Sequence, residues 1–210
     1  MFSSLSADSP LRSLLLGQVP SVEWTLTPTP QLTESYNRCV SQWSLMSAFF
    51  RSASADVRIG IPVMPVLSWI CLVGGQCPSL PFCTDLIASS PLVHGDCSAR
   101  VYQFHVGLLR ELHCGLYLSQ FGNISKNPSL DINAGVDWIF RRNGIETLIA
   151  IGHAGNTSRA MYAKRKHQKL SASTVVLTAP RRGDGKLDLV LTADIEAQIL
   201  SKSAASSASR

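Results

Sequence analysis

Residues 147–156 read Thr-Leu-Ile-Ala-Ile-Gly-His-Ala-Gly-Asn, an apolar run that ends in a turn with two glycines. The run from Thr147 to Ile151 is typical of a strand buried on both faces. The turn leads into residues 157–170, whose pattern predicts a helix. We therefore expect a strand, a tight turn and a helix in succession.

Helices and strands are predicted to alternate on both sides of this unit. Asn143-Gly144 is expected to end a helix just before the strand, and Gly74-Gly75 to form a turn. Such alternation indicates a parallel sheet covered on both faces. The sequence thus predicts an α/β fold, a three-layer α/β/α sandwich with a mostly parallel central sheet. The other predicted segments are helices over 35–53, 99–112 and 131–142, strands over 57–66, 69–73, 115–120 and 174–178, a Pro- and Cys-rich loop over 74–85 and a turn over 123–128.

The length of 210 residues fits one domain with a full core. We expect this single α/β domain over residues 21–200. Residues 1–20 are rich in Ser and Leu and are expected to be flexible; they match a mitochondrial presequence weakly, because they hold one Arg and the acidic Asp8. Residues 201–210 are rich in Ser and Ala and are expected to form a disordered tail.

The composition excludes a chain that is disordered as a whole, because 45% of the residues are hydrophobic and only 16% are charged. The longest apolar run, 59–73, is interrupted by Pro62 and Pro65 and is shorter than the roughly 20 residues of a membrane span. We therefore expect no transmembrane helix and no membrane partner. A surface poor in charge is compatible with a buried subunit contact, so we expect a homo- or hetero-oligomer.

Six cysteines are spread along the chain without a paired two-residue spacing, and the chain does not begin with a secretory signal pattern. This usage predicts reduced, partly buried thiols in an intracellular protein. The compartment expected is the cytoplasm or the mitochondrion. The six are Cys39, Cys71, Cys77, Cys83, Cys97 and Cys114.

Basic residues concentrate on the helix predicted after the glycine turn, in a chain of net charge +5. Such a cluster suits an acidic partner, which we expect to be RNA or an acidic protein. The alternative is an ordinary solvated helix face, because Tyr162 is the one aromatic residue that accompanies the charges. The cluster consists of Arg159, Lys164, Arg165, Lys166 and Lys169.

His153 lies two residues beyond the strand that ends at Ile151. In open parallel sheets, ligands bind at the carboxyl ends of the strands. Gly152 and Gly155 permit close approach of a ligand to the backbone, and Asn156 or Thr157 is placed to cap the following helix. His153 therefore has two interpretations, as a metal ligand or as a side chain that makes a structural hydrogen bond.

Residues 144–156 resemble the creatininase (creatinine amidohydrolase) family, in which a Gly, a hydrophobic strand and the motif N-G-H-G-G-N occur in this order. Leu80-Pro-Phe-Cys-Thr-Asp85 is similar to that family's L-P-L-x-T-D motif. Residues 121–125 and 128–132 are similar to its Y-G-x-S and P-G-T-x-S-L region. The resemblance spans about residues 70 to 180.

The resemblance implies a site for two divalent metal ions that activate a water molecule. Asp85 matches the bridging aspartate and His153 matches the histidine of N-G-H-G-G-N. The family's Glu and first His, which precede L-P, fall on Gly74 and Gln76, and its second His falls on Ser79. One Asp and one His cannot hold two metal ions, because each ion needs four to six donors.

Two functions follow from this comparison. The first is a creatininase-like domain with a degenerate metal site, a non-catalytic structural or binding subunit for which we expect no cofactor. The alternative is a metal-dependent amidohydrolase that acts on a carbon–nitrogen bond of the cyclic amide type, with a rearranged site that holds Zn or Mn. Residues near the motifs that could substitute as ligands are His94, Asp96, Cys97, His113 and Cys114.

Residues 152–158 are also similar to the turn G-V-x-T-N-x-C of isochorismatase-type cysteine hydrolases. Ser158 stands where that family has its thiolate nucleophile. A serine without an adjacent base is a poor nucleophile, and residues 25–31 hold no counterpart of the family's early Asp. The glycines fit neither G-x-G-x-x-G nor a phosphate-binding loop, so no nucleotide site is predicted.

Overall fold

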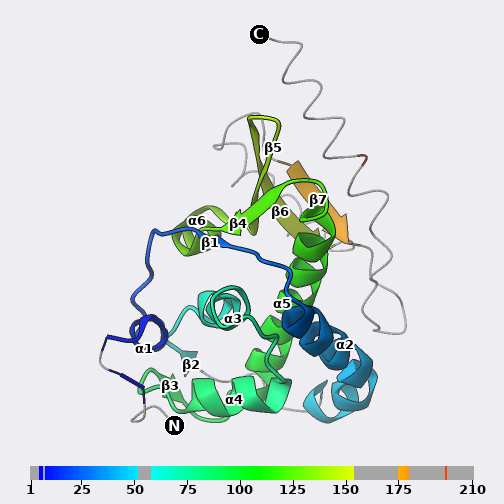
Figure 1. The fold of residues 1–210 in the computed structure, drawn as a ribbon. Helices are drawn as coiled ribbons and strands as arrows, with labels where there is room; N and C mark the ends of the chain where they lie inside the picture. The colour runs from blue at the N-terminus through cyan, green and yellow to red at the C-terminus, as the bar shows by residue number, and fades with distance from the viewer. Residues whose placement is uncertain (1–4, 7, 52–57, 154–174, 180–196, 198–210) are drawn as a thin grey trace. The chain divides into compact units, whose positions relative to one another are not determined.

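The computed structural model describes residues 5–6, 8–51, 58–153, 175–179 and 197 (Figure 1). The chain divides into two compact units, and the single domain predicted over 21–200 stays a prediction. The first unit comprises 1–20 and 27–112, and the second comprises 21–26 and 113–210. The predicted helix over 157–170 with its basic cluster, Ser158 and the tail over 201–210 lie outside the described residues.

The first unit is mainly helical. Short strands β2 and β3 pair antiparallel, with Arg58 opposite His94 and Ile59 opposite Val93. Its core contains Leu14, Leu32 and Leu67, which are all fully buried. The elements are α1 (Pro10–Leu15), α2 (Pro30–Arg51), β2 (Arg58–Ile59), α3 (Val63–Leu72), α4 (Leu80–Ala88), β3 (Val93–His94) and the part of α5 (Ser98–Leu118) that ends at Leu112.

Helix α1 lies inside the segment 1–20 that was predicted to be flexible. Its Leu11, Leu14 and Leu15 are buried, and the Leu15 carbonyl accepts a hydrogen bond of 2.6 Å from Ser90 Oγ. Within the part of the chain that the structure describes, no helix combines the length and the apolar character needed to cross a membrane.

The apolar run after Pro62 forms helix α3, so the strands predicted over 57–66 and 69–73 are wrong except at Arg58–Ile59. Pro65 lies in the first turn of α3, where its missing N–H removes no intrahelical hydrogen bond. Because α3 is buried on several sides, it lacks the polar face that would reveal a helical period. A short apolar run without such a face is equally compatible with a strand.

The predicted turn at Gly74-Gly75 is confirmed, with Gly75 at a φ of +65°. The loop predicted over 74–85 is wrong after Ser79, because Ser79 caps helix α4 by accepting a hydrogen bond from the N–H of Phe82. Helix α5 confirms the helix predicted over 99–112, but it continues to Leu118 and replaces the strand predicted over 115–120. Helix α2 confirms the helix predicted over 35–53 and begins earlier, at Pro30.

The second unit is built on a five-stranded sheet in the order β1-β4-β5-β6-β7 (Figure 1). The strands predicted over 147–151 and 174–178 are confirmed, and they pair in parallel, with Ile149 opposite Val175. The other pairings, β1 with β4, β4 with β5 and β5 with β6, are antiparallel. The strands are β1 (Trp24–Thr25), β4 (Asn123–Lys126), β5 (Trp138–Arg142), β6 (Ile145–His153) and β7 (Val175–Ala179).

The chain is therefore a mixed α/β protein, and the predicted mostly parallel sheet is wrong for the described residues. One cause is the hairpin between β5 and β6. Asn143 and Gly144 have φ values of 52° and 75°, the conformation of a type I′ turn between antiparallel strands. The helix predicted over 131–142, with Asn143-Gly144 as its stop, is accordingly replaced by α6 (Pro128–Ala134) and β5.

Residues 123–128, predicted as a turn, form strand β4 and the start of α6. Asn127 caps α6 by accepting hydrogen bonds from the N–H groups of Ser129 and Leu130. The core of the second unit contains Ile124, Trp138 and Ile149, which are nearly or fully buried.

Candidate metal centre

Three ligand-type side chains meet in the first unit: Cys39 on α2, Cys77 just before α4, and His105 on α5. One ligand atom from each lies within 4.8 Å of the other two. The exposed fractions are 8% for Cys39 and 2% for both Cys77 and His105. Two thiols and an imidazole form a donor set of the kind that binds zinc.

Helical periodicity brings Cys39 and His105 to this place. Cys39 continues the buried face of α2 that contains Leu32, Ser35 and Tyr36. His105 lies on the face of α5 that buries Val101, four residues before it. These two helices therefore supply one imidazole and one thiol from positions far apart in the sequence.

Hydrogen bonds fix Cys77 and the residue after it. The N–H of Cys77 donates to Ser35 Oγ over 2.8 Å, and the Ser35 hydroxyl donates to the carbonyl of Leu32 over 2.9 Å. The carbonyl of Pro78 lies 2.9 Å from His105 Nε2 and accepts from Cys39 Sγ over 3.4 Å. The three side chains are thus tied to one short stretch of backbone.

Hydrogen bonding and burial favour the neutral thiols of this cluster. The pKa of Cys39 is raised by its hydrogen bond with Cys77 and by burial. The hydrogen bond from Cys39 lowers the pKa of Cys77, but the contact with Cys71 and burial outweigh it and raise that pKa overall. Burial also raises the pKa of Cys83. Without a metal ion, the thiols are protonated at neutral pH.

A cavity of about 300 Å³ adjoins the cluster. Cys39, Cys77 and Pro78 line it together with the polar Arg38 and Gln76. A metal ion held by three protein ligands keeps a fourth position for water or another small ligand. The cavity has room for that fourth ligand.

The sequence correctly predicted that the cysteines are unpaired, since all six are free. All six are also buried, where partial burial was expected. It did not predict the cluster. Positions 39, 77 and 105 show no short metal-binding spacing, and only the packing of α2, α5 and the segment before α4 unites them. The signal available was the placement of Cys39 on the apolar face of a predicted helix.

Asp85 and His153, the ligands implied by the family resemblance, belong to different units. Asp85 is exposed on α4 in the first unit, and His153 ends β6 in the second unit, opposite Ala179 of β7. Their role as a metal pair stays a prediction. Next to this strand end, the carboxylate of Asp137 accepts a hydrogen bond from the N–H of Ile151.

The substitute ligands considered from the sequence lie on three different elements. His94 is exposed on β3, and Asp96 caps the start of α5 by accepting from Ser98 N–H and Oγ. The Ser98 hydroxyl and N–H lower the pKa of Asp96. Cys97 is buried, while His113 and Cys114 are consecutive residues of α5. The described residues place none of these five in a cluster of three ligand-type side chains.

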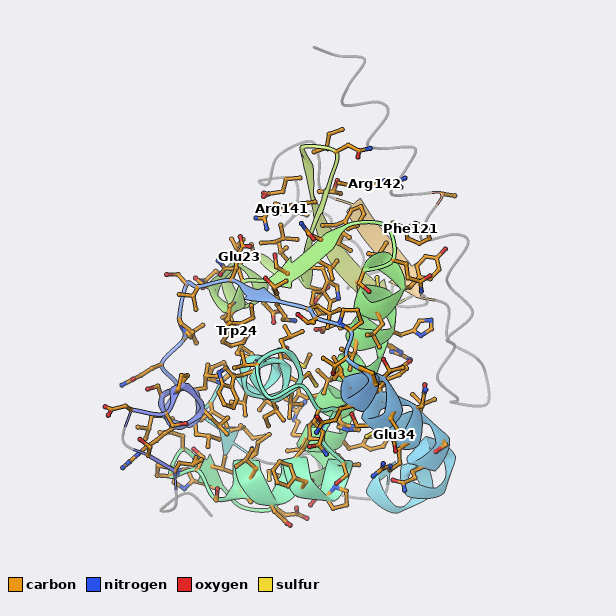
Figure 2. The ribbon with its side chains drawn as sticks, in the orientation of Figure 1. Glu23, Trp24, Glu34, Phe121, Arg141 and Arg142 are labelled. Carbon is orange, nitrogen blue, oxygen red and sulfur yellow. The ribbon has the colours of Figure 1, made fainter. Side chains whose placement is uncertain are left out.

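Two sets of ion pairs lie in the described part of the second unit. Arg141 bonds over 2.7 Å to Glu23, and Figure 2 labels both residues. Arg141 also bonds to Glu146 over 2.8 Å and donates to Ser125 Oγ. Lys126 is fully buried and pairs with Asp131 over 3.0 Å. Both groups join neighbouring elements of the sheet region.

Comparison of the chain with family models, curated proteins and solved structures found no match.

Proposed function

We propose that this chain is a non-catalytic structural or binding subunit, a creatininase-like domain with a degenerate metal site. The observation that carries the proposal is the packing around Gly74, the position that matches the family's first metal ligand. A Cβ atom at Gly74 would lie 2.4 Å from the carbonyl oxygen of Ile70. A glutamate side chain cannot be accommodated there unless the end of α3 moves.

The other two positions of this region do not supply the family's histidine ligands either. Gln76 carries a neutral amide and is exposed at the rim of the cavity. Ser79 caps helix α4. The segment therefore ends one helix and begins the next, which supports loss of the family's metal site.

The metal content of two variants, together with an activity assay of the wild type, tests whether the family's catalytic site has been lost. We expect Asp85→Ala and His153→Ala to leave the zinc and manganese content of the purified protein unchanged. We also expect no opening of the cyclic amide creatinine by the wild-type protein supplied with either metal. Loss of about one or two equivalents of metal in both variants, with turnover in the wild type, would refute the proposal.

The proposal includes an acidic partner, RNA or an acidic protein, bound through the basic cluster at 159–169. Replacing Lys164, Arg165 and Lys166 by Ala is expected to weaken binding of single-stranded RNA and to reduce its salt dependence. Unchanged affinity would exclude RNA as the partner. A charge-matched control replaces Arg38, Arg100 and Arg142, which are exposed in the described part of the chain.

The second function is the metal-dependent amidohydrolase with a rearranged site, and one observation favours it. The cluster of Cys39, Cys77 and His105 offers three ligands beside a cavity, which is how catalytic zinc is held. This alternative predicts turnover of cyclic amides that is lost in His105→Gln and retained in His153→Ala. Absence of turnover in the zinc-loaded protein would exclude it for the substrates assayed.

A further inference from the structure

We propose that Cys39, Cys77 and His105 bind one zinc ion, at a site that uses neither Asp85 nor His153, the two ligands implied by the family resemblance. The three ligand atoms lie within 4.8 Å of one another. Tetrahedral Zn–S bonds of about 2.3 Å and Zn–N bonds of about 2.0 Å place the two sulfurs about 3.8 Å apart and each sulfur about 3.5 Å from the nitrogen. Side-chain rotations that close the cluster by roughly 1 Å complete this geometry.

The chemistry of the donors selects the ion. Thiolate and imidazole ligands suit zinc, whereas magnesium and calcium take oxygen ligands. Cys71 and Cys83 lie close enough to Cys77 to influence its pKa, so sulfur also surrounds the site outside the three ligands. The surroundings therefore add to the preference for a thiophilic ion.

The hydrogen bonds of the cluster arrange its ligands in advance. A histidine that binds metal through one ring nitrogen usually donates the other N–H to a carbonyl or carboxylate. His105 Nε2 lies 2.9 Å from the carbonyl of Pro78, and the tautomer that donates there leaves the Nδ1 lone pair for the metal. The hydrogen bond from Cys77 N–H to Ser35 Oγ holds the third ligand in place.

Binding exchanges protons for the metal ion. The thiols of Cys39 and Cys77 each lose a proton to become thiolates, so the two cysteines release two protons for each zinc ion. The cavity lined by Cys39 and Cys77 gives space for a water molecule as the fourth ligand. Affinity therefore rises with pH.

Cobalt substitution in the full-length protein tests the proposal. The protein is stripped of metal with a chelator under reducing conditions and titrated with Co²⁺. We expect a thiolate-to-cobalt charge-transfer band and the visible bands of a tetrahedral ion, saturating at about one equivalent. Zinc should displace the cobalt and abolish these bands. Absence of the charge-transfer band in the wild type would overturn the proposal without any variant.

Matched cysteine variants locate the site. Cys39→Ser, Cys77→Ser and His105→Gln should each weaken binding at least about a hundredfold. Cys97→Ser, a buried cysteine of the same unit outside the cluster, should bind like the wild type, and circular dichroism checks that each variant folds. A charge-transfer band that persists in both cluster serine variants, or that is lost equally in Cys97→Ser, would refute the assignment. Loss in Asp85→Ala or His153→Ala would instead contradict the proposed function.

Discussion

Lys126 is a lysine with a side chain that is fully buried. Its ammonium lies 3.0 Å from a carboxylate oxygen of Asp131 and 5.7 Å from the centre of the Trp138 ring. Removing a charge from water is costly, and an ionic partner and an aromatic face compensate that cost only while both are present. The stability of the second unit therefore depends on Asp131 more than its partly exposed position suggests.

We expect Asp131→Asn to lower the free energy of unfolding by about 3–5 kcal/mol, because it removes the carboxylate that pairs with the buried ammonium of Lys126. Lys126→Met combined with Asp131→Asn should recover much of this loss, since both charges are then removed. Urea unfolding measures the difference. The control is Glu34→Gln, which breaks the exposed pair with Arg38 on α2 and should change stability by less than about 0.5 kcal/mol. Equal effects of Asp131→Asn and Glu34→Gln would contradict this account.

At the level of a single element, helix α5 contains two glycines with opposite surroundings. A Cβ atom at Gly115 would lie 2.7 Å from the Trp138 ring and 2.9 Å from Leu26 Cδ2. A Cβ atom at Gly107 would meet only the end of the Met64 side chain, at 3.9 Å. Gly115 is therefore required by packing, whereas Gly107 is not.

We expect Gly115→Ala to destabilise the protein by about 1–3 kcal/mol, since the rigid Trp138 ring has to move. Gly107→Ala should stabilise it by about 0.5–1 kcal/mol, because alanine favours the helix and meets no clash. Thermal unfolding of both variants shows directly which substitution lowers the stability and which raises it. A stabilising Gly115→Ala would show that Trp138 is not packed against α5 as described.

The elements also show which parts of the fold the sequence can reveal. Strand β6 was recognised because Thr147 to Ile151 form an uninterrupted apolar run, and β7 for a similar reason. The hairpin was missed because Asn143-Gly144 serves equally as a helix stop and as a type I′ turn, and the helical interpretation was applied. Helix α3 was missed because its period is hidden by apolar residues on several faces.

The cluster of ligand-type side chains could not have been deduced from spacing. Residues 39, 77 and 105 come together only after α2, α5 and the segment before α4 are packed, and each residue alone fits a buried position in a core. The residues predicted from the family resemblance, Asp85 and His153, were chosen by local motif and fall in separate units. Local sequence patterns therefore identified strands but not the site at which the potential metal ligands come together.

For the whole molecule, the way in which the chain passes between the two units bears on how folding stability changes at acidic pH. Residues 21–26 belong to the second unit, although the segments on either side of them belong to the first. Strand β1 holds this stretch by pairing with β4, and Glu23 adds ion pairs to Arg141 of β5. The hydrogen bond from Arg141 lowers the pKa of Glu23 below its usual 4.5.

A lowered pKa in the folded state stabilises the fold above the pKa of the unfolded chain, and this contribution disappears as the pH falls through the folded value. We therefore expect the free energy of unfolding to decrease from about pH 5 downward, by under about 1 kcal/mol from Glu23 because the pair is partly solvated. Glu23→Gln should remove that part of the pH dependence, measured by urea unfolding across the range. In an Arg141→Met background, Glu23→Gln should have a smaller effect on the slope, because only the hydrogen bond from the Ser125 hydroxyl then lowers the pKa of Glu23. An undiminished effect there would show that Arg141 is not the main group that lowers this pKa.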